Sequence, residues 1–322
     1  MRRIVAALCG IALCGAAPGP EPKDLSNQPG TWGFRADYSH GHPFGATAAE
    51  TSTVAAKVAA LAAIVREAAV FNPPLGFQAR PYARYSPFNC KINRNCAAGP
   101  LVAELDIVFY YFAGLTRQGN PAWGGELNSH AVFSINDLSH LIPGECFAAG
   151  SSLRVPDRRR ICLEPVESRR VAGFPVFSQR GVETLVLTNG RPAWVPMSAE
   201  EYLQAIARDR VAGPDDPLHA ELAALTPEQR ALQAWYLPSH GTGSGLVPPG
   251  TPHARPVVTE NPNYLDRALP RTAIQLLSVD LVYHMLVSEP AASDILANRR
   301  VWEFSNQADW KRIAALVEPA AQ

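Results

Sequence analysis

The residues best suited to metal chemistry are an aspartate and two histidines near the N-terminus, Asp37, His40 and His42. Histidines one residue apart on a strand point to the same side and can share a cation. Asp37 would complete three ligands and leave one position open for water, as in a hydrolytic metal site. The alternative is a polar arm with two solvated histidines, because the downstream candidates His240 and His253 have no diagnostic spacing.

A pair of carboxylates, Glu104 and Asp106, lies within the apolar run 101–115. On a strand these two side chains share one face, with their Cα atoms about 7 Å apart. Burial that raised the pKa of one of them would suit the pair to acid–base catalysis. The alternative is a pair at the solvated end of a strand.

Three consecutive arginines, Arg158, Arg159 and Arg160, lie between Cys146 and Cys162. Guanidinium groups gathered in a closed loop are suited to an anionic ligand, or to presentation to a protease as an inhibitor loop. The alternative is a solvated basic loop.

Two further patterns favour structural roles. The glycine-rich segment 239–245 lacks the Gly-x-Ser-x-Gly nucleophile turn and the lysine of a phosphate-binding loop, so it predicts a flexible loop. Asp280 and His284 could form a catalytic pair, but we favour a core histidine whose hydrogen bonds are satisfied.

Residues 1–16 have the layout of a signal peptide. Arg2 and Arg3 precede an apolar stretch that is too short to span a bilayer, and small residues follow Cys14. We therefore expect a periplasmic or secreted protein. Lipidation of Cys14 is the alternative, disfavoured because Leu13 is a poor residue before the cleaved bond.

Four cysteines remain after cleavage: Cys90, Cys96, Cys146 and Cys162. An even number in an exported chain predicts two disulfides, for which three pairings exist. We favour Cys90–Cys96 and Cys146–Cys162 because each closes a short loop. Zinc binding is the alternative, although the Cys-x-x-Cys spacing is missing.

Composition restricts the partners. The chain of 322 residues is 47% hydrophobic, enough for a core in one or two domains. Two of the 29 basic residues and none of the 29 acidic residues lie in 1–16, which leaves 27 against 29 and a charge of −2. Such a chain has no electrostatic attraction for nucleic acid or for an anionic membrane.

Thr47 to Glu50 form a capping box that predicts a helix of about 24 residues, ended by Asn72-Pro73. Its charged residues Lys57 and Arg66 indicate a solvated side, so we do not interpret it as a membrane span. Strands are predicted at 77–86, 101–115, 130–141, 174–178 and 272–286, and further helices at 291–298 and 306–317.

Asn189-Gly190 between two apolar runs predicts a β-hairpin with a type I′ turn. Thr188 would then pair with Arg191, and 191–197 would be an edge strand blunted by its two prolines. Ser198 and Glu201 form a second capping box, so a helix should follow at once. Residues 237–262 read as a long loop without secondary structure.

Together these features predict an α+β protein with a long N-terminal helix packed on a mainly antiparallel sheet, followed by C-terminal helices. Residues 17–46 would be an extended arm and 47–322 one domain, or two if a subdomain begins near 211. The favoured function is a non-catalytic, exported bacterial protein that binds a partner protein or envelope component as a monomer, without a cofactor. The alternatives are a metal-dependent exported hydrolase and an inhibitor or anion-binding module.

Overall fold

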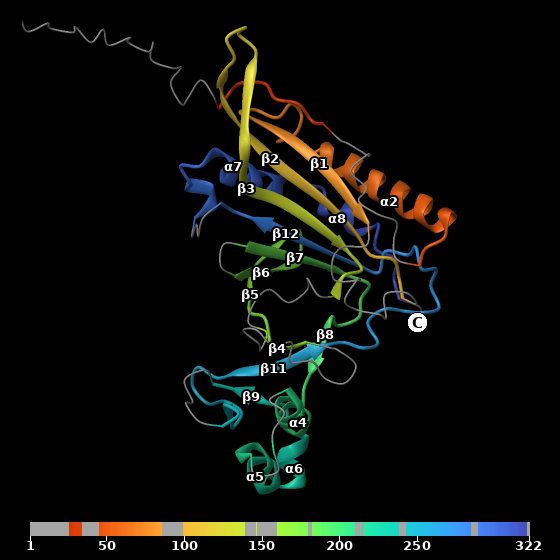
Figure 1. The fold of residues 1–322 in the computed structure, drawn as a ribbon, viewed down its shortest axis with the longest axis vertical. Coiled ribbons are helices and arrows are strands. Elements are labelled where there is room, and N and C mark those ends of the chain that lie inside the picture. Colours follow the sequence, from red (N-terminus) through yellow and green to blue (C-terminus); the bar gives the residue numbers. More distant parts are fainter. Residues whose placement is uncertain are drawn as a thin grey trace, which may run out of the picture.

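A computed structural model describes residues 26–33, 45–85, 99–138, 146, 160–179, 182–209, 213, 216–237, 243–284 and 289–320, and all structural statements refer to these. The fold is α+β, as predicted. Helices cover one side of a large antiparallel sheet, and a smaller sheet with its own helices lies beyond it (Figure 1). The predicted signal peptide, 1–16, lies outside the described residues.

The large sheet has seven strands in the order β1-β2-β3-β12-β7-β6-β5, and every neighbouring pair is antiparallel. Two three-stranded meanders are thus joined by β12, which comes from the C-terminal part of the chain. The strands are β1 Phe77–Tyr85, β2 Ala103–Leu115, β3 Pro121–Ile135, β5 Glu167–Val171, β6 Phe174–Gln179, β7 Val182–Thr188 and β12 Leu276–Val282.

The two faces of this sheet differ in character because side chains alternate along each strand. One face is apolar and forms the main core with α2 Ala48–Arg66, α7 Leu296–Gln307 and α8 Trp310–Ala314. The other face packs partly on the second sheet, through Phe177, Val186 and Leu276. The rest of this second face carries carboxylates and serines together with Val108 and Val132.

Helix α2 begins with the predicted capping box, in which Thr47 and Glu50 each bond the other's main-chain N–H. It has 19 residues and ends at Arg66, six residues before the Asn72-Pro73 stop signal. Among the described residues it is the one helix long and apolar enough, by length and composition, to cross a bilayer. Because Val58 and Leu61 are buried in the main core, its apolar face is accounted for by packing.

The predicted hairpin at Asn189-Gly190 is wrong. β7 pairs with β6 on one side and β12 on the other, so both of its edges are occupied. β8 Trp194–Pro196 pairs instead with β11, where Val195 lies opposite Thr259. Gly190 has a positive φ of 93° but Asn189 does not, so the type I′ requirement of two positive φ angles is unmet.

The second sheet has the order β10-β9-β11-β4, with β8 also paired to β11. The prediction that 237–262 lacks structure is wrong, because β11 is the strand on which this sheet is built. The sequence did not predict β11, because the strand contains Pro256 and because β9 and β10 have only two residues each. The strands are β4 Ile161–Leu163, β9 Trp235–Tyr236, β10 Leu246–Val247 and β11 Arg255–Glu260.

Two helices, α4 Ala199–Asp209 and α5 Pro217–Ala224, share a core with this sheet, and α6 Pro227–Ala231 contacts α4. α4 starts with the predicted Ser198–Glu201 capping box, and its residue Tyr202 is fully buried. The second sheet is built from residues between β3 and β12. Whether 47–322 forms one domain or two stays a prediction.

Two C-terminal helix boundaries differ from the prediction. α7 spans Leu296–Gln307, across the gap expected between 298 and 306, and α8 is a short helix that starts at Trp310. Ala297, Val301 and Phe304 are all buried, which is the i, i+4, i+7 spacing of one helical face. β3 likewise begins at Pro121, nine residues before the predicted start.

Tyr264 ties the two sheets together near the end of β7. Its hydroxyl accepts a bond from the Asn189 N–H at 3.2 Å and donates one to the Gln275 carbonyl at 3.0 Å. Burial raises the pKa of this phenol well above its usual range, so it keeps its proton. The side chain thus satisfies main-chain groups at the end of β7 and just before β12.

We predict that Tyr264→Phe lowers the free energy of unfolding by about 1–3 kcal/mol, because both main-chain partners would be left buried and unpaired. Urea denaturation measures this. Tyr111→Phe, at a half-buried tyrosine of β2, is the control and should change stability by less than about 0.5 kcal/mol. Equal effects of the two substitutions would contradict the role given to Tyr264.

Candidate functional site

Several residues singled out from the sequence lie outside the described residues. They are Asp37, His40, His42, Cys90, Cys96, Arg158 and Arg159. The N-terminal metal site therefore stays a prediction. In the part of the chain that is described, no group of three or more His, Cys, Asp or Glu side chains is placed to hold a metal ion.

Arg160, the third arginine of the run, serves an internal ion pair. Its Nε lies 2.7 Å from Glu260 Oε1, and its Nη2 donates to the Leu138 carbonyl at 3.0 Å. The neighbouring disulfide Cys146–Cys162 is present, which confirms that pairing. Burial raises the pKa of Glu260 above its ordinary value although Arg160 opposes the shift, and the nearby Asp137 raises it further.

The carboxylate pair Glu104 and Asp106 lies on β2, as predicted, but it is buried rather than solvated: 8% and 4% of their surfaces are exposed. Arg84 on β1 bridges both, with Nη1 3.0 Å from Glu104 and Nη2 3.4 Å from Asp106. Half of the Arg84 side chain is exposed. The three side chains share one face of the sheet, with the two acids beneath the arginine.

Strand register extends this pair into a row across four strands. Arg84 lies opposite Glu104, Glu104 opposite Ser134, and Ser134 opposite Ser278. Directly opposed residues have Cβ atoms about 4.5–5.5 Å apart, so the row is continuous. We call the surface that carries Glu104, Asp106, Ser134, Ser278 and Asp280 the polar face.

The two serines in the centre of the polar face are buried and unsatisfied. Ser134 and Ser278 are 2% and 1% exposed, and neither hydroxyl has a hydrogen-bond partner among the described residues. Most buried polar groups in folded proteins are paired, and an unpaired one costs about 1–3 kcal/mol. This arrangement is therefore expensive for the fold alone.

A second row lies beside the first, with Asp106 opposite Val132 and Asp280 opposite both Val132 and Thr184. Thr184 donates a hydrogen bond of 2.5 Å to Asp280 Oδ1. The main chain of His284, at the end of this strand, exchanges hydrogen bonds with the Asn298 side chain. Asp280 thus belongs to the polar face.

His130 on β3 comes near Asp106, with 3.6 Å between Nδ1 and Oδ1. An aspartate that orients a histidine is half of a nucleophilic triad. Ser134 lies four residues further along the same strand, about 13 Å away at 3.3 Å per residue. Proton transfer between His130 and Ser134 would require a direct or water-bridged contact, so this pair of residues does not form a catalytic dyad.

Aromatic side chains border the polar face. The hydroxyls of Tyr82 and Tyr110 are 3.2 Å apart, and the Arg80 guanidinium lies 4.2 Å above the Tyr110 ring. The rings supply flat, partly exposed surfaces with polar ends, a composition common in ligand sites. Counting the described side chains, three carboxylates share this face with Arg80 and Arg84.

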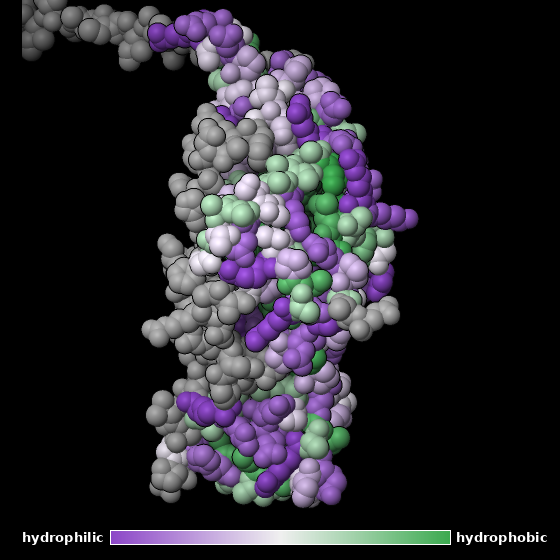
Figure 2. All heavy atoms as spheres, turned by 90° about the vertical axis from the view of Figure 1, so that its right-hand side faces the viewer, coloured by the Kyte–Doolittle hydropathy of each residue, from purple (hydrophilic) through white to green (hydrophobic). Residues whose placement is uncertain are grey.

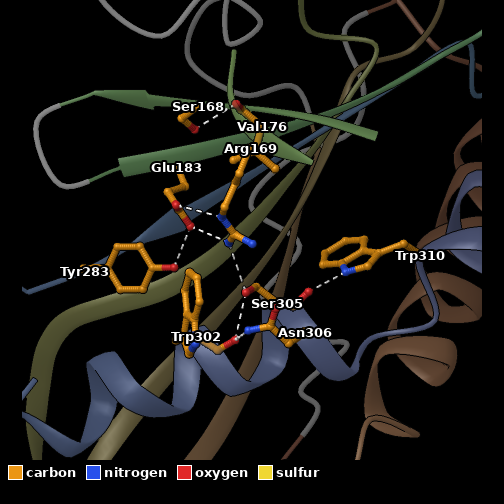
Figure 3. A network of polar contacts seen from close by, with 9 residues as sticks. All are labelled: Ser168, Arg169, Val176, Glu183, Tyr283, Trp302, Ser305, Asn306 and Trp310. Atoms are coloured by element: carbon orange, nitrogen blue, oxygen red, sulfur yellow. Dashed lines mark hydrogen bonds and ion pairs between the residues drawn. The ribbon is translucent and has the colours of Figure 1, made fainter. Parts of the chain in front are cut away.

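On the opposite face, a partly buried charge network fixes α7 to the sheet (Figure 3). Arg169 on β5 makes two bonds to Glu183 on β7, of 3.0 and 2.7 Å, and Tyr283 donates to the same carboxylate at 2.9 Å. Arg169 also bonds Ser305 at 3.3 Å and lies 4.3 Å over the Trp302 ring. We call this network the α7 clamp.

Titration supports a structural role for the clamp. Burial raises the pKa of Tyr283 far above its usual range, and the charge of Glu183 raises it further. Burial alone would lower the pKa of Arg169, but its bonds to Glu183 outweigh this and raise it. Tyr283 and Arg169 therefore keep fixed protonation states near neutral pH, unlike a general acid or base.

The sequence indicated part of the polar face. Glu104 and Asp106 stood out as neighbours on one face of a strand, and this is confirmed. Ser134 and Ser278 gave a weaker signal, because a single serine inside an apolar strand resembles ordinary strand polarity. Their alignment with Glu104 depends on register between strands that are far apart in the chain.

Comparison with known proteins finds no matching family model, no curated protein and no solved structure similar to this chain.

We predict that Arg169→Met lowers the free energy of unfolding by about 1–3 kcal/mol, because the partly buried Glu183 would lose its charged hydrogen-bond partner. The double variant Arg169→Met/Glu183→Gln should recover part of this loss. Arg170→Met is the control: Arg170 pairs with Glu167 at 2.7 Å, but its side chain is 61% exposed. Its loss should cost about 0–1 kcal/mol. A similar cost for both arginines would contradict the clamp.

We predict a pH-dependent contribution from Glu260. A carboxyl whose folded pKa is raised binds its proton more tightly when folded, so its contribution is full below 4.5 and is lost as pH rises through the folded pKa. Glu260→Gln should therefore gain stability relative to the wild type as pH rises above 4.5.

Unfolding free energies measured from pH 4 to 7 test this, and the slope of the difference is the readout. Glu50→Gln provides an opposite control, because bonds from the Thr47 N–H and hydroxyl lower the pKa of Glu50. Its contribution should disappear as pH falls below 4.5. A difference between Glu260→Gln and wild type that stays constant with pH would refute the prediction.

Proposed function

We propose that this protein is an exported bacterial binding protein, and that its polar face holds a small ligand carrying an ammonium group. The observation that carries the proposal is the pair of buried hydroxyls, Ser134 and Ser278, to which no residue in the described part of the chain is hydrogen-bonded. A bound molecule that supplies hydrogen bonds to both would remove a cost that the fold otherwise bears. Export rests on the expected signal peptide at 1–16 and agrees with the Cys146–Cys162 disulfide.

The surroundings of the two hydroxyls favour a cationic ligand. Ser134 lies directly beside Glu104, and Ser278 lies two residues before Asp280 on the same face. Carboxylates accept hydrogen bonds and do not donate them when ionised, whereas a serine hydroxyl does both. An ammonium group, with three donors and a positive charge, matches two hydroxyls flanked by carboxylates.

The charged residues of the polar face also favour a cationic ligand. Glu104, Asp106 and Asp280 contribute three negative charges, and Arg84 and Arg80 contribute two positive ones. Arg84 already bridges two carboxylates, and Arg80 is directed over Tyr110. A cation placed beside these carboxylates would lie in a partly desolvated setting, where ion pairs are stronger than in water.

Thermal unfolding of the mature protein with putrescine tests the proposal, with uncharged 1,4-butanediol as a control of equal chain length. We expect putrescine to raise the unfolding midpoint and the diol to leave it unchanged. Stabilisation should grow with concentration as expected for one site, reaching about 2.7 kcal/mol at 100 times the dissociation constant.

The double variant Ser134→Ala/Ser278→Ala should lose this response. It should also be at least as stable as wild type without ligand, because it removes hydroxyls that have no partner. Thr184→Val is the matched control: it removes a buried hydroxyl that does have a partner, Asp280, and should cost about 1–3 kcal/mol. Equal responses to putrescine and the diol, no response to putrescine, or a full response in the double variant would each overturn the proposal.

A further inference from the structure

A groove lies between α4 and α5, at the far end of the molecule from the large sheet. Its volume is about 350 Å³, within the range of small-molecule sites. Figure 2 shows hydrophobic and hydrophilic atoms side by side at this lower end, where Figure 1 places the two helices. The lining residues are Leu203, Gln204, Ala207 and Arg208 of α4, and Leu218, His219 and Leu222 of α5.

Helical spacing sorts these residues into apolar and polar rows. On α4, Leu203 and Ala207 are four residues apart and form one row, and Gln204 with Arg208 forms the row beside it. On α5, Leu218 and Leu222 repeat the apolar spacing. Two apolar rows therefore line the groove, and polar groups follow one side of it.

The floor of the groove belongs to the folded core, and its walls are accessible. Leu203 and Leu218 are each 1% exposed and belong to the core under the second sheet. Ala207 and Leu222 are half-buried, so they present apolar surface that the described chain does not cover. A ligand can reach this surface without any change in the buried floor.

Both ionisable groups that line the groove are basic. Arg208, in the last turn of α4, and His219, in the first turn of α5, are exposed, and neither has an ion-pair partner among the described residues. Four acids on or next to these helices have hydrogen-bond partners: Glu200 accepts a bond from Gln204 at 3.1 Å, and Glu201 and Asp216 cap α4 and α5. Glu221 accepts a bond from the Ser244 hydroxyl at 2.5 Å. The groove is thus apolar along its length and basic at its polar side.

We infer that this groove binds a free medium-chain fatty acid, with its hydrocarbon chain between the leucines and its carboxylate at Arg208 and His219. Charge complementarity selects this occupant, because a guanidinium beside an apolar trough matches a carboxylate attached to an alkyl chain. A neutral hydrocarbon would gain the apolar contacts but leave the basic groups unused. The site is separate from the polar face, so each can fail without the other.

Titration calorimetry of the mature protein with decanoate, below its micelle concentration, tests this inference. We expect one site per chain, and about tenfold weaker binding of decanol, which has the same alkyl chain but no charge. Arg208→Glu should weaken decanoate binding by at least tenfold and leave decanol binding unchanged. Leu222→Ala should weaken both ligands.

Arg66→Glu is the matched control, because Arg66 is an exposed arginine in the last turn of another helix, α2. It makes the same change in net charge and should leave decanoate binding as in wild type. Unchanged binding in Arg208→Glu, an equal loss in Arg66→Glu, or equal affinities for decanoate and decanol would overturn the inference. Because Arg208 and Leu222 are not fully buried, the unfolding midpoint of each variant serves as a check on folding.

Discussion

The whole structure depends on the insertion of β12 between β3 and β7. Without this strand the large sheet would separate into two meanders, each with an unpaired edge. β12 also determines what each face becomes. Leu277, Val279 and Leu281 enter the helix-covered core, while Ser278 and Asp280 point to the other side. Because strand side chains alternate, a shift of one residue would exchange the two sets.

The two faces of the large sheet are stabilised in different ways. The apolar face gains its stability from burial under α2, α7 and α8, and its one charged network is fully paired. The second face is divided between an apolar contact with the smaller sheet and the polar face, where hydroxyls and carboxylates are buried. Natural folds keep unsatisfied polar groups mainly where function requires them, so the polar face is where we place the ligand.

Local signals in the sequence predicted local structure well. The capping boxes at Thr47 and Ser198 and the short Cys146–Cys162 loop are all confirmed, because each involves groups a few residues apart. The α+β class follows from the order of elements and is also confirmed. The shared face of Glu104 and Asp106 required only that 101–115 be a strand.

The predictions that were wrong concern strands whose pairing partners are far apart in the sequence. Asn189-Gly190 has the composition of a hairpin turn, but β12 takes the edge of β7 that β8 would have used, and Tyr264 binds the turn residue. β11 escaped notice because its partners β4, β8 and β9 are short and scattered along the chain. The row from Arg84 to Ser278 has the same origin, since it exists only once four strands are in register.

The most direct test of this account is an atomic-resolution crystal structure of the mature protein with putrescine. The account predicts an ammonium nitrogen within about 3.2 Å of the Ser134 or Ser278 hydroxyl and of a carboxylate of the polar face. The contradictory result is a structure in which the two hydroxyls bond each other or an ordered water, with the diamine bound elsewhere or not at all.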